Sequence, residues 1–382
     1  MKIRNTIINI FVMTFLCHCI LLVSCGNNNG AKPNEIQISL KDLKCDTIKV
    51  AKLIQNMEII PLENKNSHMI SWPLKLSVTK IGFLIYDKPS LENEKVLYFN
   101  RQGRALNKIG AIGHGKGEYI TIYDTATDRN GDTIIVTSMG KHYLYDKTGK
   151  FLSSNEYEIQ PYGMIYKVAK TSSGYICSTD YSGADYQLHL YDKQLNLVEE
   201  LLPTNNIINH NGYTSNHIQV DGNKVFYGDY HNSSLYCFDY SNTKQMKRYH
   251  FIDEEMFSLD KPNNEEVGVH DYTGLLVDYL ENDNVICSLA HWKRETMRIK
   301  INTITNEVRK FVYDGWMPLI WDYYDGHNYV IMDQTEFLEC LKDEEYYESE
   351  ITKSEFSKKL KQVYKSSGLE INEKSNYVIL KF

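Results

Sequence analysis

The sequence predicts an all-β protein, a six-bladed β-propeller with a helical insertion near its C-terminus. Four similar apolar segments, at 96–100, 143–146, 188–192 and 235–239, end in Asp or Asn and recur about every 46–47 residues. Each segment has other β-like stretches beside it, and four strands at such a spacing are typical of a propeller blade. The charged stretch 334–368 has helix-like apolar spacing instead, which predicts one or two amphipathic helices.

The N-terminus is expected to be a secretory signal followed by a lipid attachment site. Lys2 and Arg4 precede an apolar run over 7–23, which ends in Leu-Val-Ser-Cys at 22–25. These four residues resemble the bacterial lipobox, which implies that Cys25 is lipidated and becomes the mature N-terminus. We therefore expect a signal peptide over 1–24 and a lipidated Cys25 with a flexible, polar tether over 25–35.

The composition of the remaining chain excludes some classes of partner. Removal of Lys2 and Arg4 changes the formal net charge from −7 to about −9. An acidic chain without a basic stripe argues against nucleic acid as a partner. The five cysteines after Cys25 are widely spaced and form no CxxC pair, so we expect free thiols, most of them buried, rather than a disulfide framework.

The later repeats complete the ring. Residues 284–290 with 295–303 continue the series, and 316–333 start one more blade, which makes six. The chain ends in a β-like stretch at 375–382. We expect this final strand to join blade six around the helical insertion, with "EIIPLE" (58–63) as its outer edge, because exposed strand edges invite aggregation. The propeller is thus expected to span 36–382.

Two motifs resemble a known family. "EIIPLE" followed by "KVLYFNRQGRALNKIGAIGHGKGEY" (95–119) resembles the six-bladed β-propeller lipoproteins of bacteria, which are related to NHL-like and TolB-like propellers. The resemblance extends from about residue 36 to the end of the chain, although Lys116 stands where that family usually has Pro. It implies the propeller fold and says little about activity.

The glycine cluster within that motif also looks like a phosphate-binding loop. Gly110 is followed after four residues by Gly115 and Lys116, but the next residue is Gly117 instead of Ser or Thr. A β-like stretch follows in place of a helix, so the site would lack a helix N-terminus. We expect a sharp turn between blades, with Glu118 accepting backbone hydrogen bonds and Tyr119 starting the next inner strand.

"DRNGD" (128–132) alternates Asp and Asn, as calcium loops do. The glutamate and glycine that an EF-hand requires at later positions are absent, so the sequence favours a hairpin turn at Asn130 and Gly131. No cofactor and no metal ligand is predicted from the sequence. Calcium or another divalent ion held in the central channel by several blades remains an open alternative.

Aromatic side chains near acidic residues are the candidates for a ligand-binding surface, since such pairs suit sugars and peptides. The candidate ligand-binding residues are Tyr181, Tyr230, Tyr272, Trp292 and Trp321. Packing between blades is the competing explanation for each of them. The aspartates at 180, 185, 229, 271, 278 and 322 each precede a tyrosine and could supply a catalytic carboxylate pair.

The predicted function is a lipid-anchored, non-enzymatic module of the cell envelope that binds a protein, peptide or glycan. We expect it on the outer membrane, attached through the N-terminal lipid, with the periplasmic side favoured over the cell surface. The alternative is a propeller enzyme, a metal-dependent hydrolase or a lyase, with its site at the mouth of the central channel. A scaffold without a small ligand is a third reading, because a fold alone does not assign a function.

Overall fold

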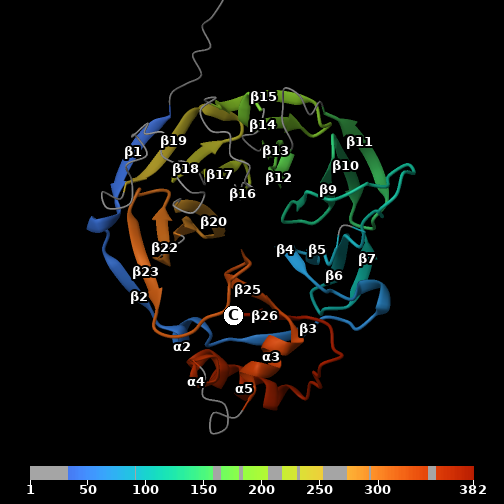
Figure 1. Ribbon diagram of the computed structural model, residues 1–382, viewed down its shortest axis with the longest axis vertical. Helices are drawn as coiled ribbons and strands as arrows, with labels where there is room; N and C mark the ends of the chain where they lie inside the picture. The colour runs from blue at the N-terminus through green and yellow to red at the C-terminus, as the bar shows by residue number, and fades with distance from the viewer. Residues whose placement is uncertain are drawn as a thin grey trace, which may run out of the picture.

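The strands form a ring of six sheets (Figure 1). The computed structural model describes residues 33–90, 92–157, 165–179, 184–204, 217–229, 233–252, 273–291, 294–342 and 350–382. We number the blades in chain order, starting from the sheet that contains β4. The predicted six-bladed propeller is therefore confirmed.

Blades 1 to 3 each contain four antiparallel strands that follow one another along the chain. Blade 1 contains β4 (Pro73–Val78), β5 (Gly82–Asp87), β6 (Lys95–Asn100) and β7 (Ala105–Lys108). Blade 2 contains β8 (Asp124–Thr127), β9 (Thr133–Ser138), β10 (Lys141–Asp146) and β11 (Phe151–Glu156). Blade 3 contains β12 (Ile165–Lys170), β13 (Gly174–Thr179), β14 (Tyr186–Asp192) and β15 (Leu197–Pro203). In each blade the first of these strands is innermost.

Blades 4 to 6 each include a strand from the N-terminal segment. Blade 4 contains β16 (His217–Asp221), β17 (Lys224–Asp229), β18 (Ser234–Asp239), β19 (Asn242–Ile252) and, parallel to β19, β1 (Asn34–Ser39). Blade 5 contains β20 (Thr273–Glu281), β21 (Asn284–His291), β22 (Arg294–Asn302), β23 (Val308–Tyr313) and, parallel to β23, β2 (Cys45–Ile48). Blade 6 contains β24 (Asp322–Tyr324), β25 (His327–Met332), β26 (Val378–Lys381) and β3 (Glu58–Pro61).

The ring closes as the sequence predicts. The C-terminal strand β26 pairs with β25 on one side and with β3 on the other, and both pairings are antiparallel. Val378 lies opposite Pro61, and Lys381 lies opposite Glu58. The third strand of the N-terminal segment and the last strand of the chain thus share one sheet, and their hydrogen bonds hold blade 6 together.

The repeated apolar segments become the third strands of blades 1 to 4. Tyr98, Tyr145, Tyr191 and Phe238 are all buried there, at the spacing that the repeat predicted. The second strands are buried on both faces, as β5 shows, because each blade packs between two neighbours. The hydrophobic core therefore consists of six clusters of buried side chains arranged around the ring, instead of a single cluster at the centre of the molecule.

Helices cover the outer side of blade 6 (Figure 1). They are α3 (Gln334–Cys340), α4 (Glu350–Lys353), α5 (Glu355–Ser367) and α2 (Val50–Leu53), with 3-10 turns η1 (Leu40–Asp42) and η2 (Asn66–His68) elsewhere in the N-terminal segment. Ser354 caps α5 by accepting a hydrogen bond from the amide of Ser357, and Gly368 ends it in the left-handed conformation. Phe337 and Phe356 are fully buried against β26.

The longest helix in the described ranges is α5, with 13 residues. Crossing a bilayer takes about 20 predominantly apolar residues. No described helix meets that requirement.

The glycine cluster forms the turn between β7 and β8. Gly110 has φ +64°, and a Cβ there would lie 2.6 Å from the Tyr119 ring and 2.7 Å from the Tyr145 hydroxyl. The amide of Gly115 donates to Glu118 Oε2 at 2.8 Å, as expected. Tyr119 does not start an inner strand, because β8 begins only at Asp124. Its buried hydroxyl donates instead to the carbonyl of Ile109 at 2.9 Å, within the turn itself.

The "DRNGD" stretch is the predicted hairpin turn, between β8 and β9. Gly131 has φ +77°, and its amide donates to the carbonyl of Asp128 at 2.9 Å. The predicted hairpin turn is therefore confirmed.

The five cysteines of the described residues are free thiols, as predicted. Cys177, Cys287 and Cys340 are buried, whereas Cys45 is exposed.

Candidate functional site

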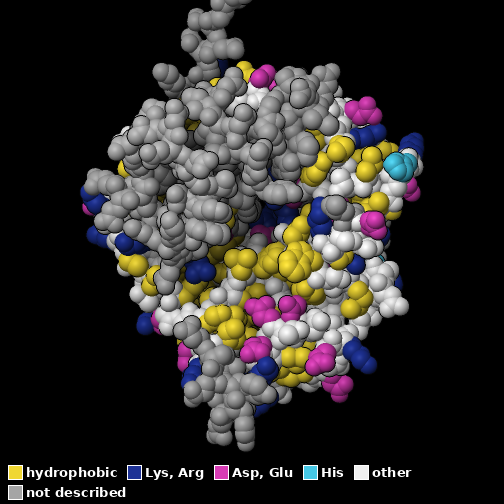
Figure 2. Space-filling model, viewed as in Figure 1, with side chains coloured by type: hydrophobic (Ala, Val, Ile, Leu, Met, Phe, Trp, Pro, Cys, Tyr) yellow, Lys and Arg dark blue, Asp and Glu magenta, His cyan; other side chains and the backbone are white. Residues whose placement is uncertain are grey.

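A cavity of about 420 Å³ occupies the central channel. The residues that line it come from β4, β8, β12, β16, β20 and β24, the innermost strands of all six blades, and from the turns beside them. Figure 2 shows the hollow at the centre of the ring, with basic side chains inside it and hydrophobic side chains beside it. Its volume lies within the ~300–1,000 Å³ range of small-molecule sites.

Apolar side chains flank the mouth of the cavity. Leu74 is 47% exposed and Leu319 is 58% exposed, yet both line the cavity. The partly buried Trp321 lies beside them, and its amide donates to the carbonyl of Tyr329 at 2.8 Å, which fixes the start of blade 6. The mouth therefore offers an apolar contact surface in front of a charged interior.

The first ion pair of the interior joins blades 1, 2 and 3. Lys75 Nζ lies 2.9 Å from Asp124 Oδ2 and donates to the carbonyl of Thr125 at 2.7 Å. The amide of Val168 donates to the same Asp124 oxygen at 2.9 Å. Burial lowers the pKa of Lys75, an effect that the Asp124 carboxylate opposes. The pair holds three innermost strands in register.

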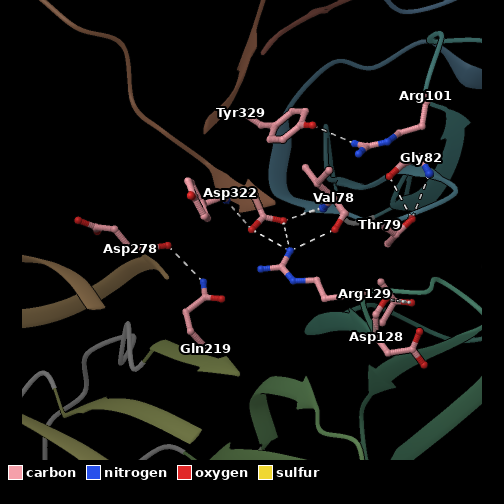
Figure 3. A network of polar contacts seen from close by, with 12 residues as sticks. Val78, Thr79, Gly82, Arg101, Asp128, Arg129, Gln219, Asp278, Asp322 and Tyr329 are labelled. Carbon is pink, nitrogen blue, oxygen red and sulfur yellow. Dashed lines mark hydrogen bonds and ion pairs between the residues drawn. The ribbon is translucent and has the colours of Figure 1, made fainter. Parts of the chain in front are cut away.

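A second ion pair joins blades 6, 1 and 2 (Figure 3). Arg129, in the β8–β9 turn, donates to Asp322 Oδ2 at 2.8 Å and to the carbonyl of Val78 at 3.1 Å. The amide of Val78 donates to Asp322 Oδ2 at 2.7 Å. The Asp322 carboxylate thus accepts hydrogen bonds from a side chain and a backbone amide, and it links blade 6 to blades 1 and 2.

A third pair lies between blades 2 and 3. The ammonium of Lys170 contacts the carboxylate of Asp128, which also accepts the amide of Gly131 at 2.8 Å. Three of the four carboxylates that line the cavity, at 124, 128 and 322, are therefore held by cations and backbone amides. Fixed charges of this kind build a rigid site, since their reorientation would break several bonds at once.

Asp278 differs from the other three carboxylates. It is the extra residue of a β-bulge in β20, where Val277 pairs with Cys287 and Tyr279 pairs with Ile286. Ser288 Oγ donates to its Oδ2 at 2.6 Å, and no cation within the described ranges forms an ion pair with it. Burial raises the pKa of Asp278 to about 6, against an ordinary value of 3.8.

Lys167 also stands apart from the paired charges of the described residues. It follows a second bulge, in β12, and lines the cavity from blade 3. It forms no ion pair or hydrogen bond through its side chain with any residue that the structure describes. Its positive charge lowers the pKa of Lys75, which places the two ammonium groups near each other.

The predicted binding residues are only partly located by this structure. Trp321 lines the cavity as proposed. Tyr181, Tyr230, Tyr272 and Trp292 lie outside the described residues, as does the lipidation candidate Cys25. Of the aspartates proposed for a catalytic pair, Asp278 and Asp322 line the cavity, but the Asp278 carboxylate accepts from Ser288 Oγ whereas that of Asp322 accepts from Arg129.

Sequence reasoning missed the four basic residues of the channel, Lys75, Arg129, Lys167 and Lys170. Each lies in the innermost strand of a blade or in the turn that follows it. Among the described residues, no group of three or more His, Cys, Asp and Glu side chains is placed to hold a metal ion.

Comparison with known proteins agrees with this architecture. A family model described as a domain of unknown function (DUF4934) matches residues 34–382. No curated protein matches the sequence. The propeller fold implied by the sequence resemblance is confirmed, whereas a specific place among the NHL-like or TolB-like lipoproteins stays a prediction.

Two solved structures share the fold. A Bacteroides fragilis NCTC 9343 protein with a provisional description as exported is 17% identical, with a TM-score of 0.63 over 91% of this chain and 99% of that chain. A member of the DUF4221 family from Bacteroides vulgatus ATCC 8482 is 8% identical, with a TM-score of 0.51 over 85% of this chain and 95% of that chain. At these identities the likeness concerns the fold alone.

Proposed function

Because this chain belongs to the DUF4934 family, whose model spans the whole propeller, we propose that it is a lipid-anchored binding protein of the cell envelope. Its ligand enters the central channel and is held there without being transformed. The membrane is its first partner, through the lipid on Cys25. A small ligand or the end of a protein or peptide chain is the second.

The observation that carries this proposal is the cavity lined by the innermost strands of all six blades. Ion pairs and backbone amides fix its charged walls, and apolar side chains flank its mouth. A preformed site loses little conformational entropy on binding, which favours affinity. A purely structural scaffold has no need of a lysine in its channel that, like Lys167, forms no ion pair with any described residue.

Binding is a better account than catalysis because three of the four carboxylates are committed to cations and amides. Acid–base chemistry needs carboxyl groups that exchange protons near the working pH. Burial raises the pKa of Asp278 to about 6, and this single carboxyl group supports the alternative of a channel enzyme only as half of a pair.

Three observations support a lipid anchor: the lipobox-like sequence at 22–25, the polar stretch that follows it, and the first described strand, which begins at Asn34. The structural likeness to a Bacteroides protein described as exported is compatible with this location. Replacement of Cys25 by Ala should abolish incorporation of a labelled fatty acid and release the protein from the membrane fraction. Fatty-acid labelling that persists in Cys25→Ala would overturn the anchor.

Thermal unfolding of the mature chain in detergent tests the binding function. We would compare glycans, peptides, calcium and EDTA, each with wild type and with Leu319→Arg, which places a charge at the mouth and spares the core. A ligand at a hundred times its Kd should stabilise the wild type by about 2.7 kcal/mol. The shift should be lost in Leu319→Arg.

The same experiment separates the alternatives. Destabilisation by EDTA that calcium reverses would favour a metal-dependent enzyme over a binding module. A ligand shift of equal size in both proteins would move the site away from the channel. If no compound shifts the unfolding of the wild type, a scaffold that recognises a large protein surface becomes the better explanation.

A further inference from the structure

Positive and negative charges do not balance on the walls of the cavity. Four cations line the cavity, and three carboxylates face it in ion pairs. The cations are Lys75, Arg129, Lys167 and Lys170. The carboxylates are those of Asp124, Asp128 and Asp322. The walls that the structure describes therefore keep one positive charge in excess, although the whole chain has a formal net charge of −7.

Asp278 does not change this balance. It lines the cavity with its backbone, whose carbonyl accepts a hydrogen bond from Gln219 Nε2 at 3.2 Å. Its carboxylate accepts instead from Ser288 Oγ at 2.6 Å, on the second strand of blade 5, and Figure 3 shows it turned away from the channel. Asp278 therefore adds a carbonyl oxygen to the channel surface but no charge.

The excess charge belongs to Lys167. The other three cations are each paired with one of the three carboxylates. The half-buried side chain of Lys167 forms no ion pair or hydrogen bond with any residue that the structure describes. Burial is the main reason why the pKa of Lys75 is lowered, and the charge of Lys167 lowers it further, so the two ammonium groups lie near each other. An anion bound at Lys167 would relieve this repulsion.

Strand β12 is distorted where it presents Lys167. Its pairing with β13 shifts between Ile165 and Lys167. Val168 and Ala169, which follow, are buried in the clusters on the two sides of blade 3, whereas Lys167 stays half-buried at the cavity. A bulge costs ladder hydrogen bonds and re-aims a side chain. The strand thus gives up regular pairing at the position where it carries the unpaired charge.

A single excess positive charge restricts the ligand class. A cation would find only carboxylates that already accept from cations and amides. A neutral ligand that covered Lys167 would remove its water without supplying a counter-charge, which costs free energy. A phosphate group carries about −1.5 to −2 charges at neutral pH and would leave negative charge beside the carboxylates of the walls. One carboxylate matches the excess.

Apolar side chains define the rest of the ligand. Leu74, Leu319 and Trp321 line the same cavity at its mouth. Leu74 and Leu319 are exposed in the free protein. An apolar body that contacts them would remove water from both surfaces, which favours binding.

We propose that the channel binds a molecule with one carboxylate on an apolar body, and that the carboxylate pairs with Lys167. This inference rests on the proposed function, because it names the ligand class of the same cavity. Aliphatic acids and the C-terminal ends of apolar peptides share this chemistry, and titration separates the two sources.

Calorimetric titration of the mature full-length protein with hexanoate tests the proposal, after subtraction of a titration into the detergent buffer alone. Hexanamide has nearly the same shape without the charge and should bind about tenfold more weakly, the equivalent of about 1.4 kcal/mol. Acetate lacks the apolar body and should bind at least about tenfold more weakly than hexanoate.

A second pair of probes identifies the source of the carboxylate. Acetyl-Ala-Leu-Ala and its C-terminal amide differ only in the charge of the C-terminus. A preference for the free peptide over the amide that depends on Lys167 would make a peptide end the ligand. The same preference in the hexanoate pair alone would make the ligand an aliphatic acid.

One variant assigns the carboxylate to its partner. Lys167→Gln should bind hexanoate and hexanamide equally, because it removes the charge that distinguishes them. It breaks no hydrogen bond among the described residues and should fold as the wild type does. Lys150→Gln, which changes an exposed lysine of the β10–β11 turn, is the matched control and should keep the tenfold preference.

Failure of this inference is distinguishable from failure of the proposed function. The ligand class is wrong if neither acid binds, if the wild type binds hexanoate and hexanamide equally, or if Lys167→Gln keeps the preference. Tighter binding of inorganic phosphate than of hexanoate would also overturn it. The binding module would survive these results if another compound gave a thermal shift that Leu319→Arg abolishes. Loss of every such shift would remove both.

Discussion

Asp278 should reduce the stability of the folded protein at neutral pH. Burial raises the pKa of its carboxyl group from 3.8 to about 6, although the hydrogen bond from Ser288 and the charge of Arg298 both favour the ionised form. One pH unit of difference between the folded and unfolded pKa corresponds to about 1.4 kcal/mol. The full difference would amount to about 3 kcal/mol, which we reduce to about 1–2 kcal/mol because the side chain is partly exposed.

Asp278→Asn removes the charge and keeps an oxygen that accepts the hydrogen bond from Ser288. The variant should therefore be more stable than the wild type by that amount at pH 8. The folded wild type binds its proton more tightly than the unfolded chain does. The advantage of the variant is therefore complete above pH 6 and shrinks as the pH falls from 6 towards 3.8.

Urea unfolding at pH 8, 6 and 4.5, followed by tryptophan fluorescence, measures this difference. Asp322→Asn is the matched control, because its carboxylate is paired with Arg129 and should be needed for stability at pH 8. An Asp278→Asn variant that is less stable than the wild type at pH 8 would refute the reasoning. So would a stabilisation that does not change with pH.

Three further predictions concern the ring itself. Arg129→Met should cost about 2 kcal/mol in urea unfolding, less than the ~3–5 kcal/mol of a fully buried pair because the Arg129 side chain is 40% exposed; an unchanged midpoint would contradict the role of this pair. Gly110→Ala should lose about 1–3 kcal/mol in the same assay, since φ is +64° and the new methyl group would meet Tyr119; a neutral result would show that the turn rearranges freely. Burial lowers the pKa of His142 from 6.5 to about 3, with a smaller contribution from the charge of His189. As the pH falls below 6.5, the unfolded chain therefore binds a proton at this position before the folded protein does, and the folded protein loses stability. When the pH is lowered from 7 to 5, the free energy of unfolding of His142→Phe, measured in urea, should fall by about 1–2 kcal/mol less than that of the wild type. An equal fall in both proteins would assign the acid sensitivity to other groups.

Much of the fold could be read from the sequence because propeller strands repeat. The spacing of Tyr98, Tyr145, Tyr191 and Phe238 reports the third strand of successive blades, where a large side chain must fill the same space each time. Closure was also predictable, since 58–63 and 375–382 are the two β-like stretches without partners in the repeat. The parallel additions β1 and β2 were not foreseen, because short, mostly exposed strands carry little periodic signal.

The candidate site was harder to predict. Its charged residues are spread over more than 240 positions of the chain, from Lys75 to Asp322, and only the closed ring brings them together. The aromatic criterion identified Trp321 and overlooked Lys167, because nothing in "YKVAK" (166–170) signals a bulge. The Asp-Tyr pattern did point to Asp278 and Asp322, although it could not separate the paired carboxylate from the unpaired one.

The position of the N-terminal segment has a consequence for how the chain reaches its native state. Strands β1, β2 and β3 complete blades 4, 5 and 6, so the segment that is synthesised first must wait for partners that follow about 200 residues later or more. The parallel edge on β19 offers an incoming strand from another copy the same hydrogen bonds during that interval. A tether that holds each molecule to its own patch of membrane would lower the frequency of such encounters, and the anchor would then protect the assembly of the ring as well as its location.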